Sequence, residues 1–146
     1  MRLAELIRRS PETLPPDASC SAAAQLMREA NVGAVVVVEG RKPLGLVTDR
    51  DLAVRVVGKG LDPARVPLSQ VMSGEPIFLT EDRSIASVIA VMRDLAIRRV
   101  MVVDDAGDLV GVVALDDLLL QIASDLAGLA EAVRKEIAPP GEVVRG

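Results

Sequence analysis

The chain contains the same sequence unit twice. The segment from Gly45 to Leu52 recurs from Gly111 to Leu118 with its glycine, its hydrophobic residues and its final Asp-Leu pair in place. The match continues upstream, where residues 26–39 align with residues 91–104. Two copies with a period of about 65 residues lie outside the range of about 20–50 residues that solenoid repeats show, so we expect a pair related by a pseudo-twofold axis. Binding sites should form between the copies, where the copies differ.

Both copies predict the order strand, helix, strand, strand, helix. In copy one, Ser19 is placed to cap an amphipathic helix, and the β-branched run at 34–38 is typical of a strand buried on both faces. A turn at 39–43, a strand at 44–47 and a helix from Thr48 to about Val57 follow. Copy two repeats this order with an extended segment at 77–79, a helix at 84–96, strands at 100–103 and 109–113, and a helix from about Leu115. The sequence therefore predicts an α+β fold of two β-α-β-β-α repeats packed with pseudo-twofold symmetry.

Length and composition predict one domain. A chain of 146 residues with 50% hydrophobic residues is long enough to bury a substantial core. We expect one domain over about 1–138, with repeat one at about 11–60, an ordered proline-containing linker at about 61–76, repeat two at about 77–125 and a C-terminal helix at about 126–138. Residues 139–146 should form a flexible tail. The C-terminal helix should pack on the domain or on a partner subunit through one apolar face: Leu126, Leu129, Ala130, Val133 and Ile137.

The missing residue types exclude several kinds of site. Because the chain has no histidine, it has no histidine base, no Ser-His-Asp triad and no histidine-bound metal. The single cysteine, Cys20, allows no intrachain disulfide, and its place among alanines favours a core residue over a reactive thiol. The acidic turn at 104–108 does not have the spacing of a calcium loop and should be solvated. We expect no metal site and, without an activated nucleophile or tuned base, no enzyme activity.

Neither a membrane nor a nucleic acid is expected as a partner. The apolar runs at 35–38 and 118–120 are far shorter than a membrane span, and the first ten residues lack the apolar stretch of a signal peptide. The expected location is the cytoplasm. Phe78 is the sole aromatic residue, whereas single-stranded nucleic acids are held by several stacked rings. The net charge of −4 gives no general attraction to phosphate backbones.

The turn before the last helix of copy one is a candidate binding element. A helix N-terminus offers unpaired N–H groups and a partial positive charge to an anion. Thr48 and Asp51 also suit a purely structural role, since a hydroxyl followed three residues later by a carboxylate is a good helix start. Both interpretations can hold together because capping and ligand binding can share these groups.

Arg98 and Arg99 form a second candidate element. They follow a helix end, where the helix dipole favours cations without any ligand. Adjacent residues that enter a strand point to opposite faces, so at least one of the two should face the cleft between the copies. Arginine suits an anion site because it is always charged and offers a forked set of donors.

These features together resemble a tandem pair of cystathionine-beta-synthase (CBS) domains. The resemblance rests on the twofold unit, on the Gly-hydrophobic-Val-Thr-x-x-Asp segment at 45–51 and on the Arg-Arg-Val-x-Val-Val-Asp strand at 98–104, and it covers about residues 11–125. Within the family the chain is similar to the stand-alone bacterial type. The resemblance implies a regulatory module that binds AMP, ADP, ATP or S-adenosylmethionine between its repeats and requires no other cofactor. It also implies homodimers and an effector protein that the sequence does not identify.

The resemblance also implies roles for residues. In the family pattern the threonine contacts phosphate or ribose, the aspartate takes the ribose hydroxyls, and basic residues of the other repeat reach the phosphates. These roles fall to Thr48, Asp51, Arg98 and Arg99. Further positions of the predicted ligand site are Leu14, Gly33, Ala34 and Asp49. Asp49 is also favoured as a surface residue by the helix dipole alone.

The two clefts between the repeats are not equivalent in sequence. Copy two has Ala114 in place of the threonine and keeps the aspartate as Asp117, while copy one has Gly33 and Ala34 in place of the arginine pair. We therefore expect one phosphate-bearing ligand per chain, with the second cleft empty or reserved for an uncharged adenosyl group. The alternative is a ligand-free dimerisation or scaffold module. A thermal midpoint that rises with ligand concentration separates the two functions.

Overall fold

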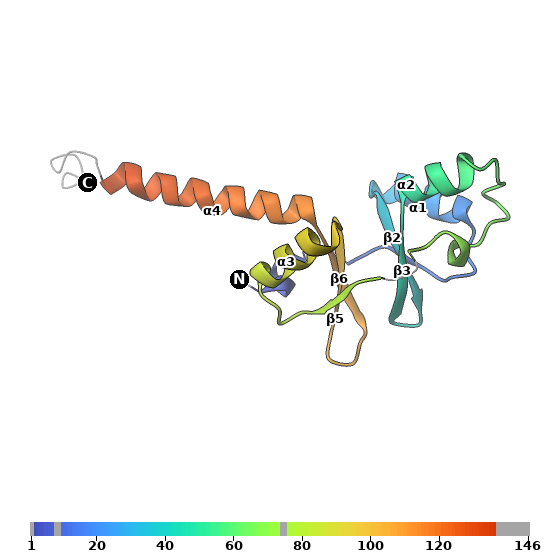
Figure 1. Ribbon diagram of the computed structural model, residues 1–146, viewed down its shortest axis with the longest axis horizontal. Coiled ribbons are helices and arrows are strands. Elements are labelled where there is room, and N and C mark those ends of the chain that lie inside the picture. Colours follow the sequence, from blue (N-terminus) through green and yellow to red (C-terminus); the bar gives the residue numbers. More distant parts are fainter. Residues whose placement is uncertain (1, 8–9, 74–75, 137–146) are drawn as a thin grey trace. The chain divides into compact units, whose positions relative to one another are not determined.

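The computed structural model, drawn in Figure 1, describes residues 2–7, 10–73 and 76–136. The chain divides into two compact units, Met1–Val113 and Ala114–Gly146. The first unit contains the sheets of both repeats, and the described part of the second consists almost entirely of one helix. The predicted α+β class is confirmed.

Each repeat forms a three-stranded sheet with the same strand order. The sheet of repeat one is β1–β2–β3 (Thr13–Leu14, Ala34–Glu39, Lys42–Thr48), and that of repeat two is β4–β5–β6 (Phe78–Thr80, Arg99–Val103, Leu109–Ala114). The first strand of each sheet runs parallel to the second, as expected when a helix connects them. In repeat one the second and third strands form an antiparallel hairpin. The shared order confirms the predicted pair of repeats (Figure 1).

One helix precedes the hairpin in each repeat. α1 (Cys20–Ala30) packs on β2, and α3 (Ile85–Leu95) packs on β5. Both helices begin as predicted, because the hydroxyl oxygens of Ser19 and Ser84 accept the backbone N–H three residues later, at 3.1 and 3.2 Å. Each helix ends at a left-handed residue, Asn31 or Ala96, a few residues before the central strand of its sheet.

The helices that end the two repeats differ in length. α2 (Asp49–Leu52) continues into a π-helical turn, η2 (Ala53–Val57), and stops close to the predicted end. α4 runs without a break over Leu115–Glu136. We expected a boundary near residue 125, but this stretch contains no proline, and its one glycine, Gly128, costs only about 1 kcal/mol in a helix interior. The predicted C-terminal helix is therefore the continuation of the last helix of repeat two.

The hairpin of repeat one is tighter than predicted. β3 starts at Lys42, because Glu39 pairs with Lys42 and only two residues, Gly40 and Arg41, turn the chain. Gly40 has a φ of +64°, which glycine adopts without steric cost. In the longer turn of repeat two, a carboxylate oxygen of Asp104 accepts two backbone N–H groups at 2.9 Å each. This acidic segment is thus a turn held by its own aspartate.

Two short segments outside the predicted repeats are exchanged between them. The 3-10 helix η1 (Leu3–Leu6) binds repeat two, where its first N–H donates to the backbone oxygen of Arg83 at 3.0 Å. The linker helix η3 (Leu68–Gln70) binds repeat one, where its first N–H donates to the backbone oxygen of Ala18 at 2.9 Å. Donors and acceptors of both bonds are related by the 65-residue repeat. Each sequence unit therefore starts with such a segment, upstream of the start that we predicted at about residue 11.

The exchange explains the glycine of the repeated motif. A Cβ atom on Gly45 would lie 3.0 Å from the sulfur of Met72, and one on Gly111 would lie 2.6 Å from a methyl carbon of Ile7. Met72 and Ile7 follow η3 and η1 at equivalent positions. The glycine is therefore the residue that admits a side chain from the exchanged segment.

The central strands form the buried layer of each repeat. β2 and β5 are buried on both faces, as predicted, with at most 3% exposure of their core residues: Val35, Val36, Val37, Val100, Met101 and Val102. Cys20 is 1% exposed in the core of repeat one, which confirms its structural interpretation. This burial raises the pKa of the Cys20 thiol. Within the described residues, no helix is long and apolar enough to cross a membrane, and no three acidic or cysteine side chains group as metal ligands.

Candidate functional site

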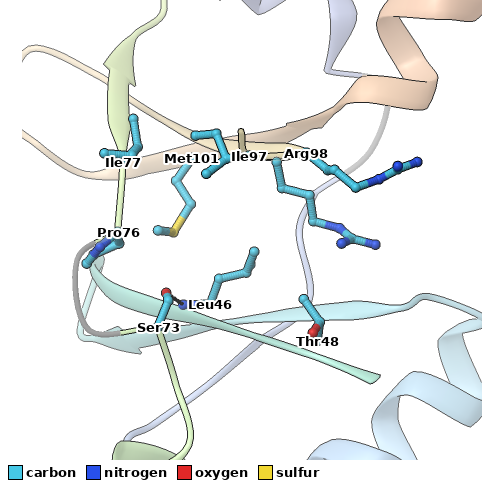
Figure 2. A pocket seen from close by; sticks show the side chains of 9 residues that line it. Leu46, Thr48, Ser73, Pro76, Ile77, Ile97, Arg98 and Met101 are labelled. Atoms are coloured by element: carbon cyan, nitrogen blue, oxygen red, sulfur yellow. Dashed lines mark hydrogen bonds between the residues drawn. The ribbon is translucent and has the colours of Figure 1, made fainter. Parts of the chain in front are cut away.

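A pocket of about 210 Å³ lies between the two repeats (Figure 2). Its lining comes from β3 (Leu46, Thr48), from the linker (Ser73, Pro76) and from repeat two (Ile77, Ile97, Arg98, Arg99, Met101). The pocket needs residues of both repeats, as predicted for a site between copies. Of the predicted ligand residues, it brings together Thr48, Arg98 and Arg99.

The pocket has an apolar end and a basic end. Figure 2 shows Ile77 and Met101 toward one end, and Thr48 and Arg98 toward the other. An apolar wall accepts a flat or aliphatic group, whereas arginines and a hydroxyl favour an anion or a polar edge. The arrangement therefore suits a ligand that is apolar at one end and negatively charged at the other.

Thr48 and Asp51 form a capping box at the start of α2. The Thr48 N–H donates to Oδ2 of Asp51 at 2.8 Å, and the Asp51 N–H donates to Oγ1 of Thr48 at 3.1 Å. The structural interpretation of this motif is thus confirmed. Asp51 does not line the pocket; its Oδ1 lies 3.9 Å from Nε of Arg55. In this structure Asp51 holds the backbone of Thr48, and Thr48 forms the pocket wall.

Both arginines line the pocket, although they are adjacent. Arg98 precedes β5 and is exposed, whereas Arg99 is the first residue of the strand and is half-buried. A Cβ atom on Gly33 would lie 3.6 Å from Nη2 of Arg99 and 3.1 Å from Oδ2 of Asp49. Gly33 therefore lies beside the Arg99 guanidinium, and its closest neighbour is the Asp49 carboxylate. Within the described residues Arg99 forms no ion pair, so its charge is available to an anion.

The remaining predicted residues of the first cleft lie outside the lining. Ala34 stands opposite Thr48 in the register of the β2–β3 hairpin. Leu14 packs against the core of repeat one, because its short strand β1 is paired with β2. Oδ1 of Asp49 accepts the N–H of the next residue at 2.8 Å. None of these three residues is part of the pocket lining.

The two residues predicted for the second cleft belong to the second unit. The Ala114 N–H donates to Oδ2 of Asp117 at 3.1 Å. This bond matches the one between Thr48 and Asp51 and caps α4 in the same way. Ala114 has no hydroxyl to complete a capping box.

Sequence reasoning missed the aliphatic lining and the linker serine. The Ser73 N–H donates to the backbone oxygen of Leu46 at 3.1 Å, and the Leu46 N–H donates to Oγ of Ser73 at 3.2 Å. Because this oxygen accepts a bond from the strand, the hydroxyl proton remains for an acceptor in the pocket. The sequence contains a signal that could have identified the linker as part of the site. The linker segment repeats the N-terminal segment with the same 65-residue shift, so it belongs to the repeat unit.

Comparisons with known proteins match both repeats and the exchanged segments. The CBS domain family model matches residues 3–58 and 68–124, which begin at η1 and η3. The CBS domain-containing protein YhcV of Bacillus subtilis is 40% identical over 119 residues, 81% of this chain and 84% of that protein. A protein of Methanopyrus kandleri is 36% identical over 132 residues, 90% of this chain and 67% of that protein.

Among solved structures, a CBS domain protein from Pyrobaculum aerophilum complexed with AMP is similar with a TM-score of 0.75 and 29% identity. The match covers 85% of this chain and 99% of that chain. Because the family model covers most of the chain and the two sheets share one topology, the chain belongs to the CBS domain family and carries a tandem CBS pair.

Proposed function

We propose that the chain is a regulatory module that binds an adenosyl ligand in the pocket between its repeats. The candidates are AMP, ADP, ATP and S-adenosylmethionine, and occupancy is signalled to a partner protein in the cytoplasm. The observation that carries the proposal is a single pocket that joins an aliphatic end to Thr48 and two arginines. The relative from Pyrobaculum aerophilum, complexed with AMP, supports the ligand class.

The apolar end of the pocket would hold the base. Its volume of about 210 Å³ is below the range of about 300–1,000 Å³ for pockets that enclose a whole drug-sized ligand. The pocket therefore encloses one part of a nucleotide, and the aliphatic residues Leu46, Ile77 and Met101 suit an adenine ring. The free hydroxyl proton of Ser73 can donate to a ring nitrogen of the base.

The basic end would hold the ribose and phosphates. Charge-assisted bonds from Arg99 and Arg98 to phosphate oxygens are stronger than neutral ones, and Thr48 adds a hydroxyl. Asp51 contributes by holding Thr48, and we propose that it also receives a ribose hydroxyl. Among the described residues of the pocket lining, no nucleophile is paired with a base, and binding without catalysis is part of the proposal. We also propose that the chain forms homodimers.

Isothermal titration calorimetry with ATP, ADP, AMP, S-adenosylmethionine and adenosine tests the proposal. Calorimetry suits the chain because it has no tryptophan or tyrosine to report binding. Wild-type protein should bind at least one phosphate-bearing ligand at one site per chain. In the double variant Arg98→Ala/Arg99→Ala, the ATP affinity should fall about 30-fold or more, while adenosine affinity changes less than about threefold.

Arg93→Ala is the matched control, since Arg93 is an exposed arginine of α3 outside the pocket. Its nucleotide affinity should equal that of the wild type. Absence of binding heat and of any thermal shift with all five compounds would contradict the proposal and favour the scaffold function.

A further inference from the structure

Arg55 lies outside the pocket lining but joins two segments that contribute to it. It belongs to η2, and its Nη1 donates to the backbone oxygen of Val71 at 3.0 Å. Its Nε lies 3.9 Å from Oδ1 of Asp51, whose other carboxylate oxygen accepts the N–H of Thr48. A guanidinium serves two such groups well because its N–H donors point in several fixed directions. Arg55 therefore connects the start of α2 to the linker between the repeats.

The backbone oxygen of Val71 is a suitable place for a charged donor. Val71 is the C-cap of η3 and is only 2% exposed. The last carbonyl oxygens of a helix have no partner within that helix, and arginine side chains near helix C-termini often donate to them. The bond fixes the linker two residues before Ser73, which lines the pocket. The position of Ser73 therefore depends in part on Arg55.

These contacts close into a ring with hydrogen bonds that hold the pocket wall. On one side, Arg55 leads from Asp51 to the linker. On the other side, the linker residue Ser73 shares two hydrogen bonds with Leu46, at 3.1 and 3.2 Å. Leu46 lies two residues before Thr48 on β3, and Thr48 is bonded to Asp51. Three lining residues are thus held by one ring, and a site that is ordered before its ligand arrives loses less entropy on binding.

In repeat two the residue equivalent to Arg55 makes a different contact. This residue is Gln121, a neutral amide that donates to Oδ1 of Asp125 within α4 at 3.0 Å. The arginine therefore stands in the repeat whose threonine lines the pocket. We infer that Arg55 is a positioning residue of the ligand site, which holds Asp51 and the linker in the geometry that the ligand requires. The inference rests on the proposed function, because it gives Arg55 a part in binding the adenosyl ligand.

Isothermal titration calorimetry of Arg55→Ala with ATP and with adenosine tests the inference. Arg55 acts on the wall proposed for the base and the ribose, which both compounds contain, so both affinities should fall by the same factor of about ten. The double variant Arg98→Ala/Arg99→Ala should instead lose affinity for ATP selectively. A purely structural effect would lower the amount of folded protein, and so the measured number of sites, without changing the affinity of the folded protein.

The matched control is Arg65→Ala. It removes an equal charge from the same linker, at a side chain that is 87% exposed, and its affinities for both compounds should equal those of the wild type. The variant Arg55→Lys covers the case in which Arg55→Ala does not fold. Lysine keeps the charge but has one donor nitrogen where the arginine uses two, so its affinities should lie about threefold below those of the wild type.

Amide hydrogen exchange of the ligand-free chain, followed by NMR, measures the positioning directly. In Arg55→Ala the N–H of Ser73 should exchange at least about tenfold faster, because the opened ring frees the linker, while Arg65→Ala should change this rate less than about twofold. Equal losses of affinity for ATP and adenosine, together with faster exchange at Ser73, support the inference.

The contrary results separate the inference from the proposed function. Unchanged affinities in folded Arg55→Ala protein overturn the inference and leave the proposed function in place. A loss of affinity for ATP alone would make Arg55 a phosphate contact and would contradict its positioning role. Wild-type protein that binds none of the adenosyl compounds overturns the proposed function, and the inference with it.

Discussion

The turns that open α2 and α4 share one bond and differ in another. In both repeats an aspartate accepts the backbone N–H three residues before it, at 2.8 Å from Thr48 to Asp51 and at 3.1 Å from Ala114 to Asp117. Only repeat one has the second bond of a capping box, in which the Asp51 N–H donates to the hydroxyl oxygen of Thr48. The shared part therefore serves the fold, since it caps a helix in both copies.

The parts that differ between the repeats include residues that line the pocket. Thr48 lines the pocket, and so does the arginine pair of repeat two, whose equivalents in repeat one are Gly33 and Ala34. Gly33 lies beside the Arg99 guanidinium, so the two equivalent positions of the repeats meet different surroundings. The two repeats therefore share one framework and differ in the residues that line the pocket between them.

The largest expected contrast is between Asp51→Ala and Asp117→Ala. Both changes remove the same backbone bond, so each should lower the free energy of unfolding by about 1 kcal/mol. Only Asp51→Ala should weaken ATP binding, by about 10- to 100-fold, because it releases Thr48 and removes a ribose acceptor. Calorimetry and urea unfolding of both variants measure the two effects separately.

Asp51→Asn separates the two roles of this carboxylate. Asparagine retains an oxygen that can accept the Thr48 N–H, so the cap survives while the charge is lost. Weak ATP binding by a fully stable Asp51→Asn protein would assign a direct contact to the carboxylate. If Asp117→Ala weakens ATP binding as much as Asp51→Ala, the single-site assignment is wrong.

The second contrast concerns Gly58, which directly follows η2, and Gly128, which lies inside α4. A Cβ on Gly58 would lie 2.8 Å from the backbone oxygen of Val54, whereas one on Gly128 would have no neighbour within 4 Å. Gly58→Ala should therefore lower the free energy of unfolding by about 1–3 kcal/mol through overpacking. Gly128→Ala should raise the helicity of α4 and stabilise it by about 1 kcal/mol. Chemical denaturation of both variants measures whether each change raises or lowers the free energy of unfolding. Equal changes in the two variants would contradict the close approach of Gly58 to the backbone oxygen of Val54.

The third contrast lies at the ends of α1 and α3. Asn31 and Ala96 both adopt a left-handed conformation with a φ of 53°, at equivalent positions of the repeats. Asparagine tolerates this region, whereas alanine is strained there by about 1–2 kcal/mol. Ala96→Gly should stabilise the protein by about 0.5–1 kcal/mol after the entropy of the unfolded glycine is counted. Asn31→Ala should destabilise it by a similar amount, and thermal unfolding of both variants measures the difference.

Local patterns were sufficient to predict most of the elements. The caps at Ser19 and Ser84, the buried central strands and the order within each repeat follow from residue periodicity and capping chemistry. That Thr48 and the arginine pair share one cleft was implied by the resemblance to CBS pairs, and all three residues line the pocket.

The missed features depend on contacts between distant segments. Nothing in an isolated alanine indicates the left-handed conformation of Ala96, which the turn into β5 imposes. Leu14, a predicted ligand residue, is partly buried against the core of repeat one and does not line the pocket. Ser73 enters the pocket because the linker is exchanged between repeats, a pairing that local propensity does not reveal.

The smallest contrast follows from Cys20, which stands where repeat two has Ile85. Burial raises the pKa of the Cys20 thiol in the folded chain. At alkaline pH the thiol therefore loses its proton more readily in the unfolded chain than in the folded chain. The unfolded chain then releases this proton first, and the free energy of unfolding should fall as pH rises above the ordinary cysteine value of about 8.5. Between pH 7 and pH 9.5 the loss should be at most about 1 kcal/mol, and Cys20→Val should lack it. Urea unfolding of the wild type and of Cys20→Val at both pH values isolates the contribution of the thiol to the pH dependence of stability. Every other titrating group is the same in the two proteins. Equal pH dependence in the two proteins would show that the thiol is not the group that titrates.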